Sequence, residues 1–262
     1  MPDLGPPLAR GRTAEIYPWG DGRVLKLFLP EFSTDAGLEE WLTHLVCRRG
    51  VPAPNPGGLL QVNNRWGLIF ERIDGVTMME YMQRRPWLLL RCARLLAELH
   101  AHMHNQPGSG LPAQKASLLR QIHRAKVLSP ELAGRIERML AALPEEERLC
   151  HSDFHPLNVL MARRGPVIID WVTAVSGNPM ADVARTSMIL RKVALPRGTP
   201  FRSLFQAARK WLNDIYLKRY FSLRPAGREQ LKAWEPVIAA ARLAEGVPGE
   251  QDALLRFIQS SL

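Results

Sequence analysis

The hydrophobic pattern of the chain changes near Gly75, and this change limits the folds that the chain can adopt. Before Gly75, apolar residues come in short runs separated by turn residues, as in β-strands. After it, they recur at three- and four-residue spacing over long stretches, as in amphipathic helices. The sequence therefore predicts a small, sheet-rich part at residues 1–74 and a larger, mainly helical part at residues 75–262.

The small part is predicted to contain two hairpins and one helix. The hairpins cover residues 16–28 and 59–73, and the helix runs from Asp35 to near Gly50. Lys26 lies in the second strand of the first hairpin, between two leucines. This lysine is a cation on a strand that is otherwise apolar.

The larger part is predicted to hold several helices, with a polar loop and a short strand between them. The helical stretches are residues 76–105, interrupted near Pro86, and residues 116–142, 203–221 and 229–262. The polar loop reads "HSDFHPLN", and the short strand that follows it ends at Asp170.

The chain is basic, with 35 Lys and Arg against 25 Asp and Glu and a formal net charge of +10. A nucleic-acid partner would fit this balance, but the basic residues are mixed with acidic ones and form no run of five or more. We therefore expect a solvated basic surface and no nucleic-acid partner. Anionic small molecules such as nucleotides fit the charge equally well.

Other features indicate a cytoplasmic protein that has no membrane partner. The longest apolar stretch, "PWLLLRCARLLAELH", is interrupted by arginines, and the first residues contain no apolar signal-peptide core. The three cysteines have no paired spacing, so neither a disulfide framework nor a zinc knuckle is predicted.

The polar loop has the residue types that phosphoryl transfer needs. Asp153 precedes Asn158 by five residues, and Asp170 follows after another twelve. In phosphoryl transfer, one carboxylate orients the attacking hydroxyl and accepts its proton, while a second carboxylate and an amide oxygen hold magnesium. Asp153 is the candidate for the first role, and Asn158 and Asp170 are the candidates for the second.

The phosphates of a nucleotide also need a cation, and Lys26 can supply it if an acid holds its flexible side chain. The helix that follows offers Glu39 and Glu40. Glu39 is favoured because helical geometry places it towards the same side as Leu42 and Val46, whereas Glu40 points away from the core.

The histidines of the loop permit another interpretation. His151, Asp153 and His155 occupy alternate positions and are potential zinc ligands. However, alternate residues of an extended chain point to opposite sides, and no matching cluster of nitrogen or sulfur donors accompanies them. His100 and His104 lie one helical turn apart and also permit a metal, but on a leucine-rich helix we expect them to pack or cap.

Taken in order along the chain, these motifs resemble the aminoglycoside phosphotransferase and choline kinase-like family. The matching pieces are "VLKLF", "GVPAPNP", "GLIFERIDG", "LAELHAHMH", "LCHSDFHPLNVL", "VIIDW" and "GNPMADVARTS". The loop together with "IIDW" is specific to the family, whereas "VLKLF" alone is a weak signal.

The resemblance implies an α+β, bilobal protein kinase-like fold, with a small β-sheet lobe containing one helix and a larger, mainly helical lobe. Residues 1–74 would form the nucleotide-binding lobe, with a hinge near residues 70–75. Residues 75–262 would hold the catalytic loop, the metal site and the acceptor pocket. The backbone near Glu71 and Ile73 would bind adenine.

The resemblance also implies the roles of the site residues. Asp153 would be the catalytic base, and Asn158 and Asp170 would bind Mg²⁺. Lys26 would contact the phosphates of ATP or GTP, with Glu39 behind it.

Two further positions are of interest in this comparison. Asp182 resembles the acid that braces the catalytic loop of the family. Ser152 stands where the family usually has glycine, so a backbone position that favours glycine carries a side chain here.

The expected activity is transfer of a γ-phosphate to a hydroxyl of a small molecule, with an aminoglycoside-type antibiotic as the first candidate. From residue 151 onward there are 16 Lys and Arg against 9 Asp and Glu, which is unusual for a protein that binds a polycation. Sugars, amino alcohols and other antibiotics therefore stay open as acceptors, as does a nucleotide-binding scaffold without activity. The sequence leaves open whether the protein is a monomer or a dimer.

Overall fold

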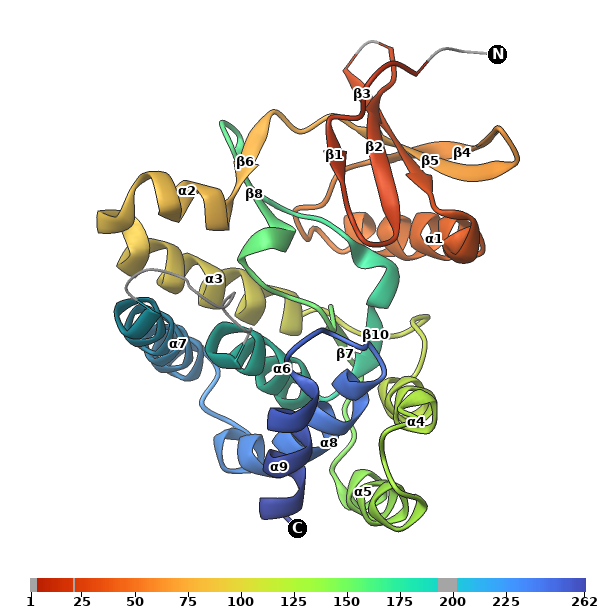
Figure 1. Ribbon diagram of the computed structural model, residues 1–262. Coiled ribbons are helices and arrows are strands. Elements are labelled where there is room, and N and C mark those ends of the chain that lie inside the picture. The colour runs from red at the N-terminus through yellow and green to blue at the C-terminus, as the bar shows by residue number, and fades with distance from the viewer. Residues whose placement is uncertain (1–3, 21, 193–201) are drawn as a thin grey trace. The chain divides into compact units, whose positions relative to one another are not determined.

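The computed structural model describes residues 4–20, 22–192 and 202–262 (Figure 1). The chain divides into two compact units. The first consists of Met1–Tyr81 and Pro156–Thr173, and the second of Met82–His155 and Ala174–Leu262. Each unit is therefore built from two separate stretches of the chain.

The main sheet of the first unit has five strands in the order β1-β2-β3-β5-β4, and all neighbouring strands are antiparallel. The strands are β1 (Ala9–Arg10), β2 (Ala14–Pro18), β3 (Arg23–Phe28), β4 (Pro56–Val62) and β5 (Arg65–Glu71). Both predicted hairpins are confirmed, as β2-β3 and β4-β5. Asn63 and Asn64 connect the second hairpin with φ angles of 52° and 60°, which matches the sharp two-residue turn that asparagine tolerates.

Helix α1 (Asp35–Arg48) confirms the predicted helix of the first unit and packs against β4 and β5. Its buried residues recur at three- and four-residue spacing, at Ala36, Glu39, Leu42, Thr43 and Val46. Glu39 is thus the one acidic side chain on the buried face, as the helical phase predicts.

A second, three-stranded sheet in the first unit was not predicted. Its strands are β6 (Gly75–Thr77), β8 (Val159–Ala162) and β9 (Gly165–Ile168), in the order β6-β8-β9. Only the apolar run of β9 was recognisable as a strand. Strands β8 and β9 form a hairpin whose open end pairs Val159 with Ile168.

The second unit is mainly helical, as predicted. Its helices are α3 (Leu89–His104), α4 (Gln114–Arg124), α5 (Pro130–Ala142), α6 (Pro179–Lys192), α7 (Arg202–Leu223), α8 (Leu231–Leu243) and α9 (Gln251–Ser260), and α2 (Met78–Arg84) precedes them at the boundary between the units. Two short strands, β7 (Arg148–Cys150) and β10 (Val175–Gly177), pair in antiparallel fashion. The predicted break near Pro86 is confirmed between α2 and α3.

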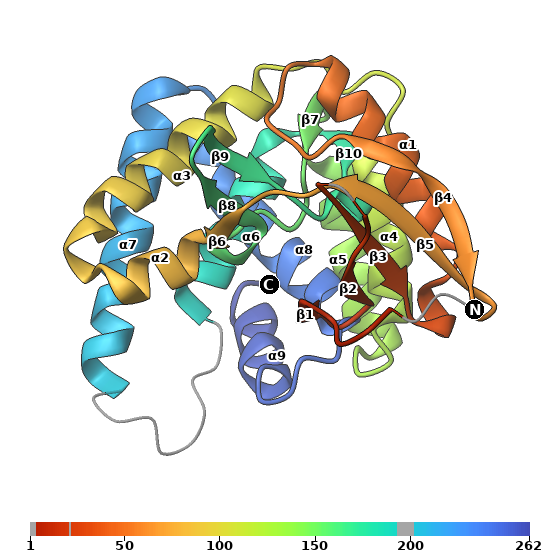
Figure 2. The ribbon, with the colours of Figure 1, turned by 90° about the horizontal axis from the view of Figure 1, so that it is seen from above.

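Helices α6 and α8 lie at the centre of the second unit and pack against each other, while α3 packs against α7 (Figures 1 and 2). Almost all of α6 and most of α8 is buried. A helix that is buried on all sides has no polar face, so its sequence lacks the amphipathic pattern. This explains why α6 was not recognised from the sequence. Among the helices that the structure describes, none combines the length and apolar character needed to cross a membrane.

Candidate active site

In the first unit, Lys26 lies between two carboxylates. Its Nζ donates to both oxygens of Glu39, at 2.8 and 2.7 Å, and to Oδ1 of Asp170 at 2.7 Å. The lysine is 9% exposed and Glu39 is 2% exposed, so this charge group is largely shielded from water. Three predicted site residues that are far apart in the sequence are therefore brought together.

The charge of Lys26 is strongly favoured in this position. Burial by itself disfavours the ammonium ion, but the carboxylates of Glu39 and Asp170 outweigh burial and raise the pKa of Lys26 above its ordinary value. Lys26 is therefore positively charged at any physiological pH.

Asn158 and Asp170 are neighbours because of the β8-β9 hairpin. Asn158 immediately precedes β8, and Asp170 follows β9 by two residues. The carbonyl of Asn158 accepts a hydrogen bond from the N–H of Ile169 at 3.0 Å, which holds the open end of the hairpin together. The hairpin, from Val159 to Ile168, thus accounts for most of the twelve-residue spacing between the two predicted metal ligands.

Asp170 has a φ angle of 67°, which is unusual for a residue with a side chain. Such a conformation costs about 1–3 kcal/mol and persists where the surroundings impose it, often at a functional site. Here the bond to Lys26 holds the side chain, which is still 37% exposed. The carboxylate therefore has a surface through which it can reach a ligand.

The predicted hinge residue Glu71 is bonded to other parts of the first unit. Its carboxylate pairs with the guanidinium of Arg164, and its Oε2 accepts from Nδ2 of Asn55 at 3.0 Å. Its backbone N–H donates to the carbonyl of Asn55 at 2.9 Å. Any adenine contact is therefore left to the carbonyl of Glu71 and to the backbone of Ile73, and this role stays a prediction.

In the second unit, the predicted base Asp153 forms an ion pair with Arg185. The Nη2 of Arg185 lies 2.8 Å from Oδ1 of Asp153, and Nε2 of His155 lies 3.4 Å from Oδ2. Burial would raise the pKa of Asp153, but the Arg185 guanidinium, assisted by His155, holds that pKa well below its ordinary value. Asp153 is therefore an ionised carboxylate at neutral pH.

Asp182 holds the backbone of the loop that carries Asp153. Its two oxygens accept hydrogen bonds from the N–H of His151 at 2.6 Å and from the N–H of Ser152 at 3.0 Å. Ser152 itself has a φ angle of 63°. The loop thus turns in a conformation that favours glycine, at the position where the family usually has it.

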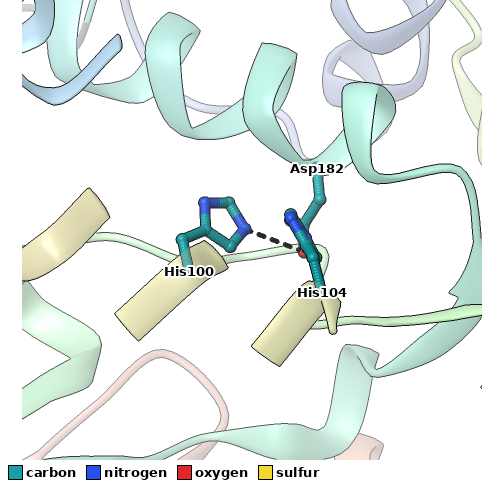
Figure 3. A group of neighbouring side chains, drawn as sticks. All are labelled: His100, His104 and Asp182. Atoms are coloured by element: carbon teal, nitrogen blue, oxygen red, sulfur yellow. Dashed lines mark hydrogen bonds and ion pairs between the residues drawn. The ribbon is translucent and has the colours of Figure 1, made fainter. Parts of the chain in front are cut away.

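Two buried histidines support Asp182 from helix α3 (Figure 3). The Nε2 atoms of His100 and His104 lie 3.2 and 3.4 Å from Oδ2 of Asp182. On the other side of each ring, Nδ1 lies 2.6 Å from the hydroxyl of Tyr216 and 2.7 Å from that of Tyr220, respectively. Burial lowers the pKa of His104 to about 3, so this ring is neutral at pH 7. Their ligand atoms lie within 4.8 Å of one another, but these polar contacts give each side chain a structural role without a metal.

A comparison with protein families decides the class of this chain. The model of the phosphotransferase enzyme family (APH) matches residues 7–234. The chain belongs to this family. The resemblance inferred from the sequence motifs is thereby confirmed.

Solved structures of similar fold include three phosphotransferases. An aminoglycoside-3'-phosphotransferase of type VIII is 18% identical, with a TM-score of 0.62 over 90% of this chain and 89% of that one. A choline/ethanolamine kinase family protein from Mesorhizobium loti is 17% identical, with a TM-score of 0.60 over 98% and 88%. The amicoumacin kinase hAmiN, in complex with AMP-PNP, Ca²⁺ and Ami, is 13% identical, with a TM-score of 0.66 over 100% and 88%.

At these levels of identity the likeness shows the fold alone. It confirms the predicted α+β, protein kinase-like class, with a small antiparallel sheet and a larger helical part. A comparison with the sequences of curated proteins finds no match.

The residues of the first unit fit the hard divalent cation that this phosphotransferase family implies. Asp170 offers a partly exposed carboxylate, and Asn158 a side-chain amide at the same end of the hairpin. Carboxylate and amide oxygens are the ligands that Mg²⁺ and Ca²⁺ prefer.

Sequence reasoning missed Arg185 and its second partner, Glu245. A signal was available, because Arg185 follows Asp182 by three residues on the same helix and therefore lies on the same face. Since Asp182 was expected to brace the loop, an arginine one turn further on α6 was a candidate for the charge beside Asp153.

Proposed function

We propose that this phosphotransferase moves the γ-phosphate of ATP or GTP to a hydroxyl of a small molecule, with Mg²⁺ as the metal. The observation that carries the proposal is the ammonium of Lys26 held between Glu39 and Asp170. A cation fixed beside a partly exposed carboxylate is suited to a metal-bound polyphosphate, because it balances the phosphate charge while the carboxylate balances the metal.

The proposal assigns a role to each predicted residue. Lys26, positioned by Glu39, contacts the nucleotide phosphates, and Asn158 and Asp170 hold the metal. When bound, the metal neutralises charge on the phosphate oxygens during transfer. Residues 1–74 bind the nucleotide, with a hinge near residues 70–75, and residues 75–262 carry the catalytic loop, the metal site and the acceptor pocket.

Asp153 acts on the acceptor hydroxyl in this proposal. Because Arg185 keeps its carboxylate ionised, Asp153 is a weak base that orients the hydroxyl and takes its proton. The hydroxyl oxygen bonds to the γ-phosphorus as the bond from that phosphorus to the nucleoside diphosphate breaks, and the diphosphate leaves. The rate enhancement then comes mainly from positioning and electrostatics, as in other kinases.

The first acceptor class to test is an aminoglycoside-type antibiotic. The motifs of the family and the fold shared with an aminoglycoside-3'-phosphotransferase support this choice. An aminoglycoside is a polycation and would need carboxylates that are available to its ammonium groups.

One observation favours a second acceptor class of lower positive charge, such as a sugar, an amino alcohol or another antibiotic. Among the described residues from Ala174 to Leu262, every acidic side chain that is not exposed already lies in an ion pair. These pairs are Asp182 with His100 and His104, Glu235 with Arg191, Glu245 with Arg185 and Arg242, and Glu250 with Arg242. The ammonium groups of a polycation would have to compete with these partners.

A screen for acceptor-dependent ADP release separates the possibilities. Purified protein, Mg²⁺ and ATP are incubated with aminoglycosides, neutral sugars, amino alcohols and other hydroxylated antibiotics, and each product is identified by mass spectrometry. Phosphorylation of one class identifies the acceptor. Tight ATP binding without transfer to any compound would instead indicate a nucleotide-binding scaffold.

A further inference from the structure

We infer that Arg185 is a positioning residue for the phosphoryl transfer: it holds the reacting carboxylate of Asp153 and ties it, through Glu245, to the turn between helices α8 and α9. This inference rests on the proposed function, because it concerns the geometry of the proposed base. The bracing of the loop backbone by Asp182 is a separate contact, to other atoms.

One nitrogen of Arg185 serves both carboxylates. Nη2 lies 2.8 Å from Oδ1 of Asp153 and 2.7 Å from Oε1 of Glu245. The two N–H bonds of this nitrogen lie in the guanidinium plane at a fixed angle, so each carboxylate takes one of them. Fixing Glu245 and the guanidinium plane therefore fixes the position of the Asp153 oxygen.

Glu245 is itself anchored by a second arginine. Arg242, on the last turn of α8, lies 3.4 Å from Oε2 of Glu245 and is held by both oxygens of Glu250, at 2.6 and 3.1 Å. Arg242 is 7% and Glu250 is 5% exposed, so the far end of this network is buried. Opposite charges alternate from the catalytic loop to the start of α9.

A second residue on the same face of α6, Thr186, holds the backbone of Phe154, which follows Asp153 in the loop. The hydroxyl of Thr186 donates to the carbonyl of Phe154 at 2.8 Å. Asp182, Arg185 and Thr186, at relative positions 0, 3 and 4, thus contact successive parts of the loop. Of these contacts, only the one from Arg185 reaches the carboxylate that reacts, and it continues through Glu245 to the turn between α8 and α9.

The test is a set of variants measured with the acceptor found in the screen. In Arg185→Met we expect kcat to fall by about 100-fold with little change in the KM for ATP, because the carboxylate is displaced while nucleotide binding is kept. Arg185→Lys should recover only part of this loss, since a lysine lacks the planar geometry. Glu245→Gln should lower kcat by about 5-fold, because its amide oxygen still accepts a hydrogen bond but carries no charge.

Arg191→Met is the matched control. Arg191 lies on the same helix and pairs with Glu235 on α8, and this pair includes no loop residue. We expect its kcat to stay within about 2-fold of the original protein, since an ion pair of this exposure contributes little. If Arg185→Met also keeps kcat within about 2-fold of this control, the inference is wrong.

The pH profile of kcat separates positioning from general damage. Arg185 from α6 and His155 from the same loop pair with the Asp153 carboxylate, the ring of His151 accepts from its backbone N–H, and Glu245 shares the Arg185 nitrogen. Without Arg185, Asp153 should protonate at higher pH, so the acidic limb of kcat should move up in Arg185→Met and stay in place in Arg191→Met. A uniform loss at all pH values, with no movement of the limb, would refute the role.

A measurement that needs no enzymatic reaction tests this inference independently of the proposed function. Titration of the Asp153 carboxyl by ¹³C NMR should move to higher pH in Arg185→Lys, because the planar hydrogen bond is lost, whether or not an acceptor is known. In Glu245→Gln it should move the other way, to lower pH, because a neighbouring negative charge that shares Arg185 is removed. Both variants keep a hydrogen-bonding group, so they decide the question even if Arg185→Met does not fold. Absence of transfer in the original protein would refute the proposed function, and an unchanged titration would refute the inference.

Discussion

Each of the two compact units contains a cation held between two carboxylates, but the two cations do different work. In the first unit the cation is Lys26, and the carboxylates belong to Glu39 and Asp170. Glu39 is fully enclosed by the helix and sheet around it, whereas the Asp170 side chain is partly exposed. Two acids therefore position one ammonium group beside a surface where a ligand can bind.

In the second unit the cation is Arg185, between Asp153 and Glu245. Here the arginine side chain is 10% exposed, and the Asp153 side chain is 27% exposed. As in the first unit, the cation is enclosed and one of its carboxylates is partly exposed, so exposure does not distinguish the two groups. They differ in the proposed function: in the first unit two acids position a cation, and in the second a cation positions an acid.

The difference follows from the chemistry of the two side chains. A lysine ammonium is a point charge that can donate in three directions, which suits a phosphate ligand of variable orientation. An arginine guanidinium is planar and always charged, which suits the fixation of a carboxylate. We expect the first group to govern nucleotide binding and the second to govern the chemical step.

The largest effect is expected from a change in the second unit, because replacing the proposed base should affect the chemical step and leave nucleotide binding intact. Asp153→Asn should lower kcat by about 10³- to 10⁴-fold, because the amide can neither take the proton nor attract it. The dissociation constant for ATP, measured by calorimetry, should stay nearly unchanged. A large loss of ATP affinity would contradict the division of labour between the units.

The corresponding change in the first unit should act on binding. Asp170→Ala should weaken Mg²⁺-dependent ATP binding by about 100-fold, because a carboxylate ligand is lost and Lys26 loses one partner. Titration calorimetry with and without Mg²⁺ measures this change, with Asp153→Asn as the matched control. Equal and small effects of both substitutions on binding and on rate would contradict the assigned roles.

Low pH should reduce the stability of the protein through the buried side chain of His104. The pKa of His104 is lowered to about 3 by burial, and then by His100, whereas an unfolded histidine titrates near 6.5. Between these values the unfolded chain binds one more proton, so stability falls as the pH falls, by about 1.4 kcal/mol per pH unit, or about 2 kcal/mol from pH 7 to pH 5.

Urea denaturation between pH 5 and pH 7 measures this slope. The His104→Gln variant should have a flatter dependence on pH, while the control variant His102→Gln, at an exposed position on the same helix, should keep the original slope. A slope that is unchanged in His104→Gln would show that another group causes the acid sensitivity.

The smallest expected effect concerns Ser152, which has a positive φ angle and directly precedes the proposed base. Ser152→Gly should relieve backbone strain and stabilise the protein by up to about 1 kcal/mol. Ser152→Ala keeps the strain and should give no such gain. The midpoint of thermal unfolding measures both, and a loss of stability in Ser152→Gly would mean that the serine side chain makes a compensating contact.

The burial of Lys26 and Glu39 was predictable because both residues follow local rules. The phase of helix α1 selected Glu39 over Glu40, and the apolar neighbours of Lys26 indicated a buried strand. The hairpin that joins Asn158 to Asp170 was not predicted, because β8 is only four residues long and follows a polar loop without a clear pattern.

The second unit was harder to predict where burial is complete. Helix α6 was missed because an element that is buried on all sides shows no alternation of apolar and polar residues. The sequence left the partners of Arg185, Arg191 and Arg242 open, and the structure pairs each of them with an acid. Such pairs join residues from different helices, and no local pattern encodes them.

The sequence by itself determined the order of the motifs, the division into a sheet-rich and a helical part, and the types of residue available for phosphoryl transfer. These follow from spacing and periodicity, which are properties of neighbouring residues. The family and its kinase-like fold came from the resemblance of the motifs to known proteins. The tertiary structure alone decided which partner each charged side chain has: Lys26 with Asp170, and Asp153 with Arg185 and Glu245. Electrostatic interactions act through space, so their strength depends on distances that the order of residues does not contain.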